Sequence, residues 1–147
     1  MTLQGEYVPS PAQWVREQVE IYEGSGGQQA NTLRDTGLPV IIVTMRGNKS
    51  GKVRKIALMR VAHNGEYALV ASKGGAPEHP VWYYNLKANP EATVTIGRDT
   101  WHATARTATP RERDEIWAKG LTFYPGWRKY EGRAGSRHIE AFVLSRN

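Results

Sequence analysis

The sequence predicts a mainly β, single-domain protein with peripheral helices (α+β), built as a small closed or split β-barrel. Three observations predict it. Short segments rich in β-branched residues recur along the chain and are separated by turns that contain glycine and asparagine. Helical patterns interrupt these segments at only a few places. At 147 residues the chain has the length of one domain with one sizeable core, so residues 1–147 are expected to fold as a single unit.

The N-terminal part predicts a helix over residues 11–22, with Trp14, Val15, Val19 and Tyr22 near one face. A loop rich in glycine and glutamine follows at residues 24–33, and we expect it to be flexible. An aromatic-bearing helix of this kind can pack on the barrel, cover a site or lie on a membrane. Packing on the barrel is the favoured interpretation.

The next part of the chain predicts three strands. Residues 38–45 form a continuous β-branched run that is typical of a core strand, and residues 47–51 form a turn. Residues 53–62 return as a strand. His63, Asn64 and Gly65 then predict an Asn-Gly hairpin turn, which leads into a strand at residues 66–71.

The C-terminal half predicts a short helix, a hairpin, a longer helix and a closing strand. Pro80 suits the first position of a helix that Asn89 and Pro90 end. The longer helix begins at a capping box in which Thr109 and Glu112 bracket Pro110, and it runs toward Leu121. The expected strands are residues 92–96, 100–105 and 139–144, with the hairpin turn at residues 97–99.

Composition limits the classes of function. The chain contains no cysteine, which excludes disulfides, thiolate metal sites and a cysteine nucleophile. Its formal net charge is +6, which suits an anionic partner such as nucleic acid, an acidic membrane surface or a polyanionic cofactor. No apolar run approaches the roughly 18 residues that span a bilayer, and no secretory signal is visible. The expected location is cytoplasmic, or peripheral to the inner face of the membrane.

The positive charge is concentrated in one segment. No acidic residue occurs between Thr36 and Gly65, whereas six basic residues fall close together: Arg46, Lys49, Lys52, Arg54, Lys55 and Arg60. Such a segment can be a solvated edge whose lysines discourage strand pairing, or it can bind an anion. The absence of any compensating acid favours an anion site.

A second segment combines a strand end, glycines and a helix start. Ser72-Lys73-Gly74-Gly75 follows the strand at residues 66–71 and offers a cation and two unhindered backbone amides. The short helix that follows is expected to pack on the protein through Trp82, Tyr83 and Leu86. This arrangement suits a planar ligand with an anionic arm, although an ordinary connection rich in turn residues has the same composition.

Ser-Lys-Gly-Gly at residues 72–75 and His-Pro-Val-Trp-Tyr-Tyr-Asn-Leu-Lys-Ala-Asn-Pro at residues 79–90 are similar to the signature of the deazaflavin (F420)-dependent nitroreductases of actinobacteria. The resemblance runs from about Pro39 to the C-terminus, and the first thirty or so residues match poorly. It implies an FMN-binding-protein-like split β-barrel and an enzyme that uses coenzyme F420. Hydride would pass from reduced deazaflavin to a quinone, nitroaromatic or activated enone acceptor.

The resemblance also implies a cofactor site. In the family, the turn that matches residues 48–55 holds the phosphate and acidic tail of the cofactor. Apolar burial of the ring has to supply the rest of the affinity, and this is the expected role of the strand end at residues 70–73 and of residues 81–85. The expected cofactor-binding residues are Asn48, Lys49, Ser50, Arg54, Lys55, Ile56, Ala57, Leu58, Arg60, Val70, Ala71, Ser72, Lys73, Val81, Trp82, Tyr83, Tyr84 and Asn85. The family often has asparagine in place of Ile56 and proline in place of Ala57, so the ring contacts differ there.

An aromatic cluster at residues 123–130 is the expected acceptor site. Tyr124, Trp127 and Tyr130 recur every three residues, which places them on one side of a helical turn. Aromatic stripes are more often core, but tyrosines at these positions line the substrate pocket in the family, and Trp127 replaces one of them. Ser72 and Tyr130 are the expected catalytic hydrogen-bond donors, with Lys73 adding positive field.

No group of residues indicates an intrinsic reactive centre. The four histidines lack metal-ligand spacing, so no metal site is expected, and no nucleophile elbow occurs. This pattern favours chemistry supplied by a cofactor. The alternatives are FMN binding within the same fold, with FMN less favoured than F420, and a basic nucleic-acid-binding barrel. Because the charge lies in one segment, we expect no nucleic-acid partner. The expected partner is a small-molecule acceptor, and the expected state is a monomer or weak dimer.

Overall fold

The computed structural model describes residues 3–32, 37–71, 80–123 and 140–147. Within them it contains three helices and seven strands. The helices are α1 (Gln13–Gly24), α2 (Val81–Ala88) and α3 (Pro110–Phe123). The strands are β1 (Val40–Arg46), β2 (Val53–Met59), β3 (Val61–His63), β4 (Glu66–Val70), β5 (Glu91–Ile96), β6 (Asp99–Thr107) and β7 (Ala141–Arg146).

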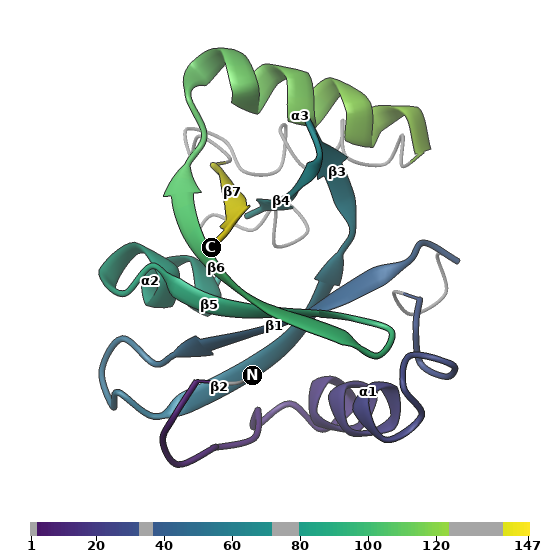
Figure 1. The fold of residues 1–147 in the computed structure, drawn as a ribbon, viewed down its shortest axis with the longest axis vertical. Helices are drawn as coiled ribbons and strands as arrows, with labels where there is room; N and C mark the ends of the chain where they lie inside the picture. Colours follow the sequence, from purple (N-terminus) through teal and green to yellow (C-terminus); the bar gives the residue numbers. More distant parts are fainter. Residues whose placement is uncertain (1–2, 33–36, 72–79, 124–139) are drawn as a thin grey trace.

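The strands form one antiparallel sheet in the order β2-β1-β5-β6-β7-β4-β3. The two edge strands, β2 and β3, are consecutive in the chain and are separated only by Arg60. The sheet must therefore curl until its edges approach each other, and Figure 1 shows this curl around the centre of the molecule. The mainly β, split-barrel architecture predicted from the sequence is confirmed.

One expected strand is divided in two. Residues 53–62 were predicted as a single strand, but β2 ends at Met59 and β3 begins at Val61. At the break, the backbone N–H of Arg60 donates to the carbonyl of Pro39 at 2.9 Å. The residues before the break pair with β1 and those after it pair with β4. The chain therefore passes at Arg60 from one edge of the curled sheet to the other. Local pattern cannot show such a change of partner, because both halves remain extended.

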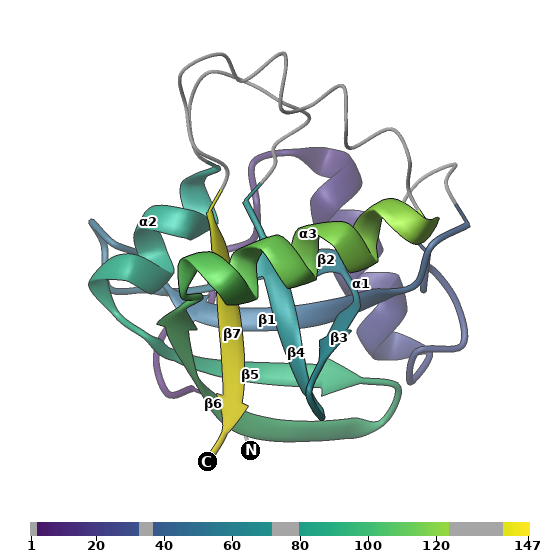
Figure 2. The ribbon, with the colours of Figure 1, turned by 90° about the horizontal axis from the view of Figure 1, so that it is seen from above.

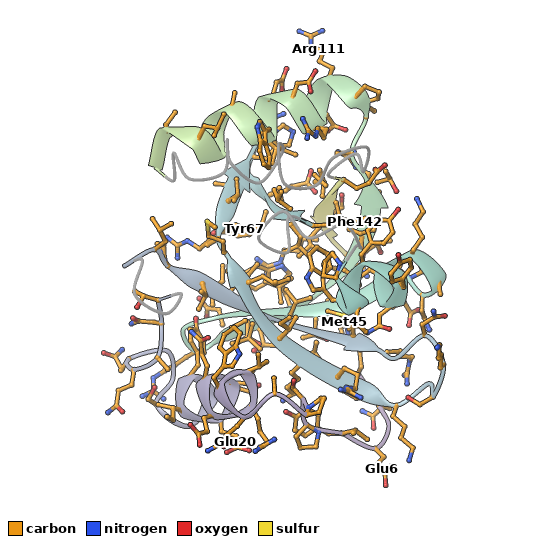
Figure 3. The ribbon with its side chains drawn as sticks, turned by 180° about the vertical axis from the view of Figure 1, so that it is seen from behind. Glu6, Glu20, Met45, Tyr67, Arg111 and Phe142 are labelled. Atoms are coloured by element: carbon orange, nitrogen blue, oxygen red, sulfur yellow. The ribbon has the colours of Figure 1, made fainter. Side chains whose placement is uncertain are left out.

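The main core fills the inside of the curled sheet. Ile41, Val43 and Met45 alternate along β1 and point inward, and Phe142 of β7 meets them. Trp82 and Leu86 of α2 close one side of this core, as the sequence predicted. Figure 3 shows the gathering of Met45, Tyr67 and Phe142 in the interior, whereas Glu6, Glu20 and Arg111 lie at the periphery.

Helix α1 packs on the outer face of the sheet, at the opposite end of the molecule from α3 (Figure 1). Val19 and Tyr22 are buried against Val40, Ile42 and Ala57. The predicted packing face is therefore correct for its second half. Trp14, at the start of the helix, remains 45% exposed.

Helix α3 lies across β4 and β7 when the molecule is seen from above (Figure 2), and it buries Ile116 and Trp117 against Val61, Ala68 and Val143. The predicted capping box is present. The N–H of Glu112 donates to Thr109 Oγ1 at 3.2 Å, and the N–H of Thr109 donates to Glu112 Oε1 at 3.0 Å. Within the described residues, none of the helices has both the length and the apolar character needed to cross a membrane.

Candidate functional site

A cavity of about 660 Å³ lies beside the turn between β1 and β2. Its size falls within the range of small-molecule and cofactor sites. Five parts of the chain build its wall: the end of strand β1, the β1–β2 turn, strand β2, the N-terminal half of α2 and the N-terminal segment with the start of α1. The residues that line this candidate pocket are Ser10, Val15, Met45, Gly47, Asn48, Lys49, Ser50, Arg54, Lys55, Ile56, Val81, Trp82, Tyr84 and Asn85.

Strand alternation decides which β2 side chains face the barrel. Arg54 pairs with Met45 and Ile56 pairs with Val43, and both partners belong to the inner core. Because directly paired residues share a face of the sheet, Arg54 and Ile56 point toward the barrel interior. Lys55 lies between them and therefore points to the outer face, where α1 packs. The two adjacent cations thus leave the strand in opposite directions.

Two glycines shape the turn at residues 47–51. The N–H of Gly47 donates to the carbonyl of Lys52 at 2.7 Å, and the N–H of Gly51 donates to the carbonyl of Gly47 at 2.9 Å. A Cβ on Gly47 would lie 2.8 Å from Ser50 Oγ, so a larger residue would displace Ser50. Gly51 adopts a φ of 70°, which favours glycine. The turn can therefore present Lys49 and Ser50 at the mouth of the candidate pocket.

Helix α2 fixes this turn through one buried amide. The backbone N–H of Asn48 donates to Asn85 Oδ1 at 2.8 Å, and Asn85 is 6% exposed. Asn85 Nδ2 in turn donates to Met45 Sδ at 3.8 Å. The Asn85 side chain therefore ties the turn to both α2 and β1, and the turn and the helix line the same cavity.

Ion pairs divide the cations of the basic segment into two groups. Lys52 Nζ lies 2.7 Å from Glu6 Oε2, and Lys55 Nζ lies 2.8 Å from Glu23 Oε2. Lys49 and Arg54 form no ion pair with any described residue. Among the described residues that line the pocket, Lys49 and Arg54 thus offer two uncompensated positive charges to an anionic ligand.

Tyr7 lies next to the paired cations. The Lys55 ammonium stands 5.1 Å from the centre of its ring. Burial, first of all, and the carboxylates of Glu23 and Glu20 raise the pKa of the Tyr7 hydroxyl. Tyr7 is therefore a neutral phenol at physiological pH, and it offers a ring face rather than a charge to Lys55, which lines the pocket.

Ten of the eighteen expected cofactor residues line the candidate pocket. They are Asn48, Lys49, Ser50, Arg54, Lys55, Ile56, Val81, Trp82, Tyr84 and Asn85. The sequence grouped these residues through the basic segment and the short helix, which lie 37 positions apart where Asn48 meets Asn85. The structure brings both segments to one cavity.

Six other expected residues lie outside the lining. Ala57 packs under α1, because alternation turns it away from the neighbouring Ile56, and Arg60 is exposed at the link between β2 and β3. Tyr83 is buried in the main core, 5.5 Å from the ring centre of Phe142. The remaining three also pack in the two cores and are Leu58, Val70 and Ala71. Treating residues 56–58 as one contact surface ignored the two faces of the strand.

The other expected site residues lie outside the described residues. These are Ser72, Lys73, Tyr124, Trp127 and Tyr130. They include both expected hydrogen-bond donors and all three expected acceptor-site aromatics.

Four lining residues were missed from the sequence. Met45 and Gly47 adjoin the expected turn, and the inward alternation of β1 would have identified Met45. Ser10 and Val15 come from the N-terminal segment, which pairs with β2 through backbone hydrogen bonds. Nothing in the local pattern of residues 3–15 indicates that contact. Among the described residues, no group of three or more histidine, aspartate or glutamate side chains is placed to hold a metal ion.

Known proteins are similar to this chain over most of its length. A family model described as F420H(2)-dependent quinone reductase matches residues 14–146. An F420H(2)-dependent quinone reductase of Mycobacterium tuberculosis is 32% identical over 129 residues, which cover 86% of this chain and 85% of that protein.

Two solved structures are also similar to this chain. An F420-H2 dependent reductase, FDR-A, is 42% identical with a TM-score of 0.66, and the match covers 73% of this chain and 94% of that one. A structure described as a domain-swapped dimer is 41% identical with a TM-score of 0.68, and the match covers 92% of this chain and all of that one. The resemblance noted in the sequence is therefore confirmed, and this chain belongs to the F420H(2)-dependent quinone reductase family.

Proposed function

We propose that this protein transfers a hydride from reduced F420 to a quinone, and that the candidate pocket holds the coenzyme. One observation carries the location of the site. The cavity joins an apolar and aromatic wall, which includes Ile56 and Trp82, to the uncompensated cations Lys49 and Arg54. A flat ring with an anionic arm needs both kinds of surface at once.

The lining residues fit such a coenzyme on physical grounds. Trp82 and Ile56 offer apolar surface for a ring, and burial of that surface supplies the non-directional part of the affinity. Lys49 lies on the turn at the mouth, where it suits a phosphate or carboxylate that remains partly hydrated. Arg54 is half-buried, so its guanidinium makes the stronger contact.

When bound, reduced F420 supplies the hydride from C5 of its deazaflavin ring. The protein positions the coenzyme and the acceptor and supplies the electrostatic environment of the reaction. Trp82 and Tyr84 exclude water from one side of the pocket, and Asn85 keeps the turn in register with them. Reduction of a quinone to a hydroquinone consumes one hydride and one proton in net terms. Ser72 and Tyr130 remain the proposed hydrogen-bond donors to the acceptor oxygen, and Tyr124 and Trp127 remain the proposed acceptor-site residues.

The test begins with binding. Purified protein is titrated with F420, FMN and NADPH while intrinsic tryptophan fluorescence is followed, because Trp82 lines the pocket. We expect saturable quenching by F420 and weaker or no response to FMN and NADPH. Tight binding of FMN without a response to F420 would show that the choice of cofactor is wrong.

Turnover is measured separately, because binding alone does not establish a reaction. Reduced F420 is oxidised anaerobically against a quinone, a nitroaromatic compound and an activated enone. We expect the quinone to be reduced fastest, with nitroaromatic and enone acceptors as slower substrates. Protein that binds F420 and reduces none of the three would act as a carrier of the coenzyme and not as a reductase.

We also propose that the protein is a monomer or a weak dimer and that α1 makes weak peripheral contact with the cytoplasmic face of the membrane. Trp14 is 45% exposed and Ile21 is 47% exposed on this helix, which supports a surface contact. Light scattering over a concentration series measures the mass of the protein in solution and so tests the proposed oligomeric state. Sedimentation with anionic phospholipid vesicles tests the contact, and retention of all the protein in the supernatant would disprove it.

A further inference from the structure

The N-terminal segment, residues 3–24, forms part of the candidate pocket. The N–H of Val8 donates to the carbonyl of Val53 at 2.9 Å, and the N–H of Val53 donates to the carbonyl of Glu6 at 2.8 Å. These bonds hold the segment against the start of β2. It then continues through Ser10 and Val15, which line the pocket, into α1 on the outer face of the sheet.

This segment carries the acids that the basic segment lacks. Glu6 lies 2.7 Å from the Lys52 ammonium, and both side chains are at least half exposed. Glu23, in the last turn of α1, accepts hydrogen bonds from Lys55 Nζ at 2.8 Å and 3.0 Å through its two carboxylate oxygens. The Lys55 and Glu23 side chains are only 18% and 33% exposed, so this second pair is less hydrated and less screened.

The direction of Lys55 explains why this pair forms. Lys55 pairs with Thr44 across β1, on the outer face that α1 covers, whereas Arg54 pairs with Met45 on the barrel face. The Lys55 ammonium also lies over the Tyr7 ring, which belongs to the same N-terminal segment. Lys55 still borders the pocket, but its charge is directed to Glu23.

We propose that Glu23 determines the charge specificity of the coenzyme site by neutralising Lys55. The inference rests on the proposed function. With Glu23 in place, Lys49 and Arg54 are the cations that bind the anionic tail of F420. Loss of the Glu23 charge releases Lys55 as a third cation at the border of the pocket. Glu23 therefore weakens binding of polyanionic ligands, and its removal strengthens their binding.

The experiment compares the wild type with three variants. Glu23→Gln removes the carboxylate charge. Glu17→Gln removes the same charge from the same helix, at a carboxylate that accepts a hydrogen bond from Gln13, and serves as the matched control. The Glu23→Gln/Lys55→Ala double variant removes the released cation as well. Dissociation constants are measured by fluorescence titration for F420 and for a deazaflavin that lacks the phosphate and acidic tail, at low and at moderate salt.

We expect Glu23→Gln to bind F420 about two- to fivefold more tightly, which is the scale of one surface ion pair. Glu17→Gln should match the wild type, and the double variant should lose the gain. Affinity for the tailless deazaflavin should stay the same in Glu23→Gln. The gain should also shrink as salt rises, because the released charge is partly exposed.

Several outcomes would overturn the inference while leaving the proposed function intact. One is F420 binding by Glu23→Gln that is no tighter than binding by Glu17→Gln. Another is an equal change for F420 and the tailless deazaflavin, since that would report a rearranged pocket and not a charge effect. A gain that persists in the double variant would also refute the role of Lys55. Wild-type protein that fails to bind F420 at all would instead refute the proposed function.

Discussion

Asn85 Oδ1 accepts a hydrogen bond from the backbone N–H of Asn48 at 2.8 Å, which joins two residues that are 37 positions apart in the chain. Asn85 is buried in α2, and Asn48 lies in the turn between β1 and β2. The contact connects the apolar and the cationic parts of the candidate pocket. We therefore expect Asn85 to act as a positioning residue, whose effect on a bound ligand is transmitted through the turn.

Asn85→Ala should lower both stability and F420 affinity. The change removes the acceptor of the Asn48 N–H, and because Asn48 is exposed and can bind water instead, the loss is about 0.5–1.5 kcal/mol of unfolding free energy. The freed turn no longer holds Lys49 at the mouth, so the dissociation constant for F420 should rise. Urea denaturation and fluorescence titration measure the two effects. Asn89→Ala, just beyond the same helix, is the control. Unchanged F420 affinity in a destabilised Asn85→Ala protein would show that the turn keeps its position without the bond.

Removal of the uncompensated cations should raise the KM for F420 and leave the KM for the quinone unchanged. Lys49 is exposed, so Lys49→Ala should raise the KM for F420 about two- to fivefold. Arg54 is half-buried and can form charge-assisted hydrogen bonds, so Arg54→Ala should raise it about tenfold or more. Steady-state kinetics with each substrate varied in turn measures both terms.

Arg111→Ala is the matched control for these two variants, because it removes one positive charge from the exposed surface of α3 at the far end of the molecule (Figure 3). Its KM for F420 should equal that of the wild type. If Lys49→Ala and Arg54→Ala alter only the acceptor term, the assignment of these cations to the coenzyme tail is wrong.

Gly27→Ala should destabilise the contact between α1 and the β5–β6 hairpin. Gly27 has a φ of 80°, and a Cβ there would lie 2.6 Å from the backbone Cα of Gly97. Backbone atoms cannot move aside as a flexible side chain can, so the hairpin must shift. This shift would strain the bond in which the Gly97 N–H donates to the buried Tyr22 Oη at 2.8 Å. We expect a loss of about 2–4 kcal/mol of unfolding free energy, from backbone strain together with the weakened bond.

Gly37→Ala separates the two causes of that loss. Gly37 has a similar φ of 72°, but no described atom lies within 4 Å of the position of its Cβ. It therefore reports the cost of the backbone conformation alone, about 1 kcal/mol. Equal destabilisation of the two variants in urea would mean that the approach of Gly27 to Gly97 contributes nothing.

The elements of this fold were predictable where a local signal has a direct structural cause. The hairpin turn is an example, since Asn64 and Gly65 adopt the positive φ angles of 50° and 80° that the Asn-Gly pair indicates. The capping box at Thr109 is another. Each of these signals acts within a few residues, so the local sequence alone determines the conformation of the turn or of the helix start.

The candidate site was predictable only in part, because it depends on contacts between distant segments. The family resemblance indicated both walls of the pocket, but alternation along β2 places Ala57 on the face opposite Ile56 and outside the pocket lining. The N-terminal contribution of Ser10 and Val15 was not predicted. It depends on pairing of residues 6–8 with Val53, which is a tertiary contact without a local pattern.

Glu112→Gln should reduce stability at neutral pH and remove a pH-dependent part of it. The Arg106 guanidinium, which donates to both Glu112 oxygens at 2.7 Å and 2.8 Å, holds the pKa of this carboxyl well below its usual value of 4.5, with further help from the Thr109 N–H. A carboxylate whose pKa is lower in the folded state contributes stability above the pKa of the unfolded chain, and this contribution is lost as pH falls toward the folded value. The wild type should therefore exceed Glu112→Gln in unfolding free energy at pH 7, and the difference should shrink steadily below about pH 4.5. Urea denaturation over a pH series measures this difference. Glu115→Gln is the control, since among the described residues Glu115 forms an ion pair with Arg111 alone, across an exposed turn of the same helix. A difference between wild type and Glu112→Gln that stays constant from pH 7 to pH 3 would show that the capping carboxylate stabilises α3 without its charge.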